Sequence, residues 1–264
     1  MEQNGNELLE RVVPVSSPAV IAELRETLRA IEGDGHRRRE MLPFGIGRVD
    51  SHLADGGLRL DALHEVCAAT PELGDDAAAT LFVAGIAARA WGPVLWVVRR
   101  RDLFAPGLYQ AGLAPERVLY AEARDDTELL ALMEEGLRHR GLGAVIGEVH
   151  RASTAATRRL QLAAEGGRTI ALLMRRHARE GTDPFAIPSA ALTRWRVAAA
   201  PSAPLPVPGI GRARWLVTLV RQRGGEPLEL LLEACDESGR LALPAALGDR
   251  SRAPGRAAPR TAAA

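Results

Sequence analysis

Residues 63–98 read LHEVCAATPELGDDAAATLFVAGIAARAWGPVLWVV, and this stretch decides the fold. It holds two short apolar runs, 63–67 and 94–98, on either side of an alanine-rich segment at 75–91. A run of about five apolar residues has the length of a buried strand, whereas the alanine-rich segment is long enough for a helix. The stretch therefore predicts a strand, a crossover helix and a second, parallel strand.

The same alternation continues toward the C-terminus. Apolar runs that predict strands recur at 118–121, 144–149 and 169–174, and the segments between them have helical patterns at 125–140 and from Ser153 to 165. After residue 185 the runs at 192–197, 215–220 and 228–232 follow one another without helices, and Gly224-Gly225 is a hairpin signal. The predicted fold class is α/β, with a mostly parallel twisted sheet flanked by helices and antiparallel strands at its C-terminal edge.

The composition changes at both ends of the chain, which predicts three parts. Residues 1–41 form an extension with an amphipathic helix that starts after Ser17, and its apolar Leu24 and Leu28 are candidate contacts to the core or to another subunit. Residues 42–247 form the core. Residues 248–264 are rich in Ala, Arg and Pro and are expected to be disordered.

The composition also excludes several chemistries. All 34 residues in the Lys and Arg count are arginine, so no mechanism that needs a lysine ammonium is available. The two cysteines in apolar runs suggest a reducing compartment, and without a signal peptide or a membrane span the expected location is the cytoplasm. The histidines show no metal-ligand spacing. Aromatic residues make up only 4% of the chain, which is too few to predict a platform for stacking single-stranded DNA.

Residues 42–58, LPFGIGRVDSHLADGGL, resemble the segment that precedes the first core strand of RecA-like ATPases. In that family a phosphate-binding loop follows the strand, and here the corresponding residues run from Thr70 through Pro71 and Glu72 to Asp75 and Asp76. The resemblance places the lysine position on Asp76 and the magnesium-binding hydroxyl on the next residue, an alanine. Two aspartates at a helix N-terminus are expected to cap its amides and to repel a triphosphate.

Other positions of the RecA-like pattern are changed as well. By this resemblance Arg101 takes the place of the catalytic glutamate, Glu148 that of the Walker B aspartate, and Arg175-Arg176 that of the nucleotide-sensing glutamine. The change to Glu148 does not by itself argue against nucleotide binding, because a glutamate at this position can still bind magnesium. The three other changes together predict that the chain hydrolyses no ATP, has no catalytic residues and needs no cofactor.

A RecA-like core of this length without the P-loop lysine, with a helical extension and an Arg-Pro tail, resembles the ImuA family over about residues 18–245. The resemblance implies an accessory role in SOS-induced translesion DNA synthesis and mutagenesis. The implied partners are ImuB, which is an inactive relative of Y-family polymerases, RecA, and an error-prone replicative polymerase. Two alternatives stay open, a division inhibitor of the SulA type and a RecA-superfamily ATPase with a divergent loop.

Arginines follow two of the predicted strands at the edge where α/β folds build their binding sites. Arg99, Arg100, Arg175 and Arg176 are therefore candidate contacts to an acidic partner or, less directly, to DNA phosphate. The alternative is that the arginines at this edge pair with Asp75, Asp76 and Glu148. Such internal ion pairs would hold the RecA-like shape without a ligand.

Overall fold

The computed structural model describes residues 40–177, 181–202, 205 and 208–244. The predicted extension with Leu24 and Leu28 and the predicted C-terminal tail lie outside the described residues, so both stay predictions. The division of the chain into three parts is likewise a prediction.

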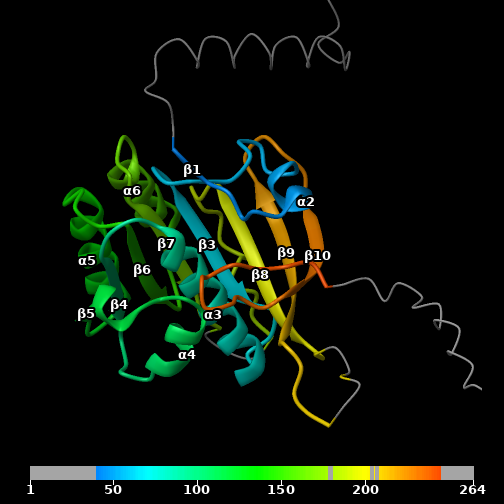
Figure 1. The fold of residues 1–264 in the computed structure, drawn as a ribbon. Helices are drawn as coiled ribbons and strands as arrows, with labels where there is room; N and C mark the ends of the chain where they lie inside the picture. Colours follow the sequence, from blue (N-terminus) through cyan, green and yellow to red (C-terminus); the bar gives the residue numbers. More distant parts are fainter. Residues whose placement is uncertain (1–39, 178–180, 203–204, 206–207, 245–264) are drawn as a thin grey trace, which may run out of the picture. The chain divides into compact units, whose positions relative to one another are not determined.

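The core is one large sheet with helices on both faces (Figure 1). Its strand order is β10-β9-β8-β3-β7-β6-β4-β5. Its strands are β3 (Leu63–Ala68), β4 (Val94–Val98), β5 (Val118–Glu122), β6 (Ala144–Val149), β7 (Ile170–Arg175), β8 (Thr193–Ala200), β9 (Arg214–Gln222) and β10 (Leu228–Glu233). The helices are α2 (Gly47–Asp50), α3 (Leu73–Arg89), α4 (Ala105–Gln110), α5 (Asp126–Arg138), α6 (Thr154–Ala164) and the short 3-10 turn η1 (Pro115–Arg117). A separate two-stranded pairing joins β1 (Met41–Leu42) to β2 (Leu58–Arg59).

The sheet confirms the predicted α/β class and refines its antiparallel edge. Strand β8 runs parallel to β3, and the antiparallel part begins with β9, which pairs with β8 on one side and β10 on the other. The hairpin between β9 and β10 turns at Gly224, whose φ of 80° suits glycine.

The continuous apolar runs predicted parallel strands that are buried on both faces. The structure shows that this holds for some of the parallel strands but not for all of them. The four central strands β3, β4, β6 and β7 are almost wholly buried, but β5 is an edge strand with no strand paired on its outer side among the described residues. Its Leu119 and Tyr120 are both about half exposed. Position in the sheet, which the sequence pattern does not encode, accounts for the difference. Cys235 also differs from expectation, because it follows β10 in a loop and is only partly buried.

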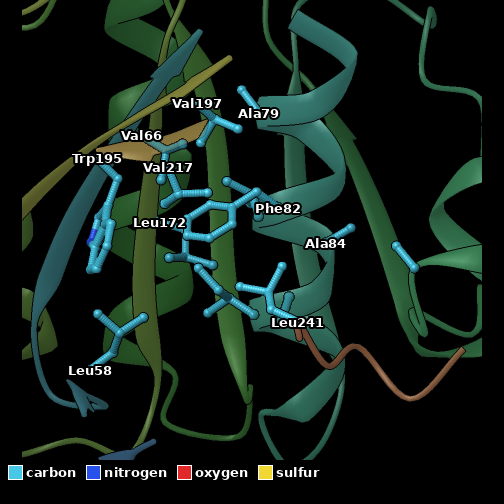
Figure 2. Close-up of a cluster of buried hydrophobic side chains, with 14 of the residues drawn as sticks. Leu58, Val66, Ala79, Phe82, Ala84, Leu172, Trp195, Val197, Val217 and Leu241 are labelled. Carbon is cyan, nitrogen blue, oxygen red and sulfur yellow. The ribbon is translucent and has the colours of Figure 1, made fainter. Parts of the chain in front are cut away.

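Helix α3 covers one face of the sheet and α5 and α6 cover the other (Figure 1). Figure 2 shows Phe82 of α3 among side chains from the sheet, including Leu172 and Val217. Its ring centroid lies 5.9 Å from that of Trp195, and Phe44 completes this aromatic cluster from the segment before α2. Because this packing fixes α3 against β3 and β8, the first turn of α3 is held at the carboxyl edge of the sheet.

Candidate functional site

A pocket of about 720 Å³ lies at this edge, between the start of α3, the segment leading into α4 and the ends of β4, β6 and β7. This is the place of the predicted phosphate loop. Its lining residues are Pro71, Leu73, Asp76, Ala77, Thr80, Leu81, Arg99, Arg100, Asp102, Leu103, Phe104, Gly107, Leu108, Glu148, His150, Arg176 and His177.

The Arg176 side chain joins two of the three carboxylates that line the pocket, those of Asp76 and Glu148. Its Nη2 lies 2.8 Å from Glu148 Oε2, its Nη1 donates to Asp76 Oδ1, and Nη2 also donates to Thr80 Oγ1 at 3.2 Å. Burial opposes the charge on Arg176, but Glu148 and Asp76 outweigh it and raise the pKa of the guanidinium. The other oxygen of Glu148 accepts from Trp96 Nε1 at 2.7 Å, so the carboxylate is held from both sides.

Asp75 does not cap helix α3, contrary to expectation. The helix begins at Leu73, two residues earlier than predicted, so Asp75 lies inside the first turn. Its Oδ2 accepts from Thr70 Oγ1 at 2.7 Å and from Thr70 N–H at 3.1 Å, and its Oδ1 accepts from Ala199 N–H of β8 at 2.8 Å. Asp75 therefore ties the loop before the helix to the neighbouring strand. The N-cap position is Glu72, whose side chain makes no capping bond.

The three arginines that follow β4 diverge. Arg99 lines the pocket and lies 3.2 Å from Asp126 Oδ1 and 3.3 Å from His150 Nδ1. Arg100 also lines the pocket, is exposed, and has no ion-pair partner among the described residues. Arg101 was expected at the position of the catalytic glutamate, but it does not line the pocket. It is exposed and pairs with Glu122 at the end of the edge strand β5.

Arg175 is not the partner-contacting residue that its position suggested. Its side chain is 2% exposed and faces the opposite side of the sheet, where Nη1 lies 3.2 Å from Glu65 Oε1. The second oxygen of Glu65 accepts from Arg194 Nε at 2.7 Å. Burial lowers the pKa of Arg175, and Glu65 partly offsets that effect. Because Arg175 lies two residues after Leu173 in β7, both side chains lie on the face covered by α5 and α6, and Arg175 points away from the pocket.

Sequence reasoning missed three residues that shape this region. Glu65 is fully buried within β3 and organises two arginines, yet it looks like an ordinary strand residue in the sequence. Leu73 and Phe104 line the pocket with 84% and 72% of their surface exposed. Phe104, an aromatic residue two positions before Pro106, was the one available signal.

The chemistry of the pocket follows from these contacts. A phosphate group at the start of α3 would meet the carboxylates of Asp76 and Glu148, and the cation between them is already shared by both. Within the part of the chain that the structure describes, no group of three or more His, Cys, Asp or Glu residues is placed to hold a metal ion. No described helix is long and apolar enough to cross a membrane.

The sheet order and the pocket at the strand ends define a RecA-like domain. The crystal structure of the RadB recombinase superposes with a TM-score of 0.53 at 16% identity, over 77% of this chain and 99% of that one. Protein ImuA of Caulobacter vibrioides, from two strains, is 41% identical over 203 residues, which is 74% of this chain and 83% of that protein. The chain belongs to the ImuA family. No protein-family model matches it.

Proposed function

We propose that this protein is a non-catalytic accessory factor of SOS-induced translesion DNA synthesis and mutagenesis. It acts in the cytoplasm by binding other proteins through its RecA-like surfaces. Membership of the ImuA family supports the process, and the state of the pocket supports the absence of ATP hydrolysis.

The observation that carries the proposal is the bridge from Arg176 to Asp76 and Glu148. A P-loop binds nucleotide because bare amides and a lysine face the phosphates. Here the chain has no lysine, and Arg176, the cation that pairs with Asp76 in the first turn of α3, is neutralised within the protein. Triphosphate binding would require breaking this ion pair and placing several negative charges beside two carboxylates.

The proposed partners are an ImuB-type relative of Y-family polymerases, RecA and an error-prone replicative polymerase. Contact with DNA is indirect in this proposal. Two observations support that choice: aromatic residues make up only 4% of the chain, and many of the described arginines are engaged in ion pairs or with backbone carbonyls.

Titration calorimetry with Mg-ATP and Mg-ADP tests the non-catalytic part, with RecA as the positive control. We expect no heat of binding and no phosphate release. Measurable nucleotide binding would instead favour the divergent ATPase.

A strain that lacks the gene tests the process. We expect the wild-type gene to restore ultraviolet-induced mutation to rifampicin resistance. A pull-down separates the partners: retention of the ImuB-type protein or RecA supports the proposal, whereas retention of the division protein FtsZ alone favours the SulA-type inhibitor.

A further inference from the structure

We propose that the mouth of the pocket binds a peptide segment of a partner protein in which a large apolar side chain stands beside a carboxylate. The inference rests on the proposed function, since it names the surface through which such an accessory protein holds a partner. In this proposal a peptide, and not a nucleotide, binds at this edge of the sheet.

The apolar part of the site comes from two separate elements. Leu73 begins helix α3 and Phe104 immediately precedes α4, and both side chains are largely exposed although they line the same pocket. Leu81 and Leu103 extend the apolar lining between them. Large apolar side chains held at the mouth of a concave pocket are the usual receptors for an apolar anchor of a partner.

The charged part of the site is at the mouth and not at the inner wall. Inside, Arg176 is satisfied by Asp76 and Glu148 and offers no free charge. At the mouth, Arg99, Arg100 and Asp102 line the pocket.

The two mouth arginines differ in how far they are engaged. Arg99 shares the carboxylate of Asp126 with the backbone N–H of Arg151, whereas Arg100 has no ion-pair partner among the described residues. A single carboxylate beside the apolar anchor complements the guanidinium of Arg100, which is unpaired among the described residues. The several charges of a nucleotide do not, because they would extend inward to Asp76 and Glu148.

A selection with a defined probe tests the site. A phage-displayed library of random dodecapeptides is selected on the full chain, and the best peptide is then made with a fluorescent label. We expect the enriched sequences to share Leu, Ile or Phe next to Asp or Glu. Fluorescence anisotropy then gives its affinity for the wild-type chain and for each variant.

The variants test the apolar part and the charged part of the site separately. We expect Phe104→Asp, Leu73→Asp and Arg100→Glu each to weaken binding at least tenfold. The matched controls are Leu162→Asp and Arg158→Glu on the exposed side of α6, which should change the affinity less than twofold. A peptide whose carboxylate is replaced by lysine should regain affinity for the Arg100→Glu variant. Circular dichroism confirms that each variant is folded.

Three results would overturn the site: no enriched peptide, enriched peptides without the apolar-acidic pair, or binding that is indifferent to all three pocket variants. Each leaves the proposed function standing if the gene still restores mutagenesis. Conversely, Mg-ATP that binds the chain and displaces the peptide would count against the proposed function itself.

Discussion

Arg175 and Arg176 are consecutive in the chain, but their side chains serve opposite faces of the sheet. Arg175 meets Glu65 at 3.2 Å on the face covered by α5 and α6, and Arg176 meets Glu148 at 2.8 Å on the face covered by α3. The end of β7 therefore carries an ion pair on each face of the sheet. On the α3 side, the bond from Arg176 to Asp76 connects the strand directly to the first turn of the helix.

Replacing Arg176 with methionine should destabilise the domain. The substitution keeps the bulk but leaves Glu148, which is 10% exposed, and Asp76, which is 38% exposed, without their cation. Breaking a buried pair costs about 3–5 kcal/mol, and partial solvent screening of Asp76 reduces the expected loss to about 2–3 kcal/mol. Urea denaturation measures it, with Arg158→Met as the surface control. A loss below about 0.5 kcal/mol would show that the bridge is not a structural element.

Glu65→Gln should cost more than Arg176→Met. Glu65 is fully buried and accepts from both Arg175 and Arg194, so the neutral amide leaves two guanidinium groups without a compensating charge. We expect a loss of about 3–5 kcal/mol in the free energy of unfolding. Glu237→Gln, at an exposed position, is the matched control. If Glu65→Gln were as stable as Glu237→Gln, Glu65 would not have the stabilising role that its ion pairs with Arg175 and Arg194 imply.

Gly143→Ala should disrupt the start of β6. A Cβ at this position would lie 1.9 Å from the backbone oxygen of Trp91, which cannot withdraw without moving the turn after α3. We expect a loss of about 3 kcal/mol or failure to fold. At Gly47 in α2 an added Cβ meets nothing within 4 Å, so Gly47→Ala should be neutral or slightly stabilising. Thermal melts of the two variants compare them directly, and similar melting temperatures would argue against the close approach.

The order of the buried strands and of helices α3, α5 and α6 followed from local pattern, because the strands are short apolar runs and these helices have 11 residues or more. The short helices α2 and α4 were not predicted. The predicted second strand, 94–98, matches β4 residue for residue. The exposed edge of β5 could not be predicted, since an edge strand and a central strand can have the same apolar sequence. The parallel pairing of β8 with β3 likewise depends on how distant segments meet.

The candidate site was predictable in its residue types and less so in its geometry. The RecA-like register brought Asp76, Glu148 and Arg176 to one place, and the structure has them in contact. Because successive side chains of a strand point to opposite faces, Arg175 and Arg176 could have been assigned to different faces of the sheet from the sequence alone. Their adjacency in the sequence instead favoured the interpretation of the two arginines as one cluster. The pairing of Glu65 with Arg175, 110 positions apart, arises only from the tertiary fold.

His64 should make the stability of the domain depend on pH. Its ring is 1% exposed, Nε2 faces the carbonyl of Arg59 at 2.9 Å, and Nδ1 lies 2.7 Å from Thr193 Oγ1. That hydroxyl already accepts from Trp195 Nε1, so it is set to donate to a neutral imidazole. Burial, the largest effect, lowers the pKa of His64 from 6.5 to about 4.

The sign of the effect follows from which state binds the proton. Between pH 6.5 and about 4 the unfolded chain binds a proton that the folded ring does not. Stability is therefore retained above pH 6.5 and falls as the pH drops, by up to about 1.4 kcal/mol per pH unit. Carboxylates elsewhere contribute equally to a His64→Gln variant, so the difference between the two urea-midpoint curves isolates this residue. The variant should be less stable at pH 7.5 and lose less on acidification, whereas His139→Gln, at an exposed position, should run parallel to the wild type. Parallel curves for His64→Gln would mean that the buried ring takes up its proton as readily as it does in the unfolded chain.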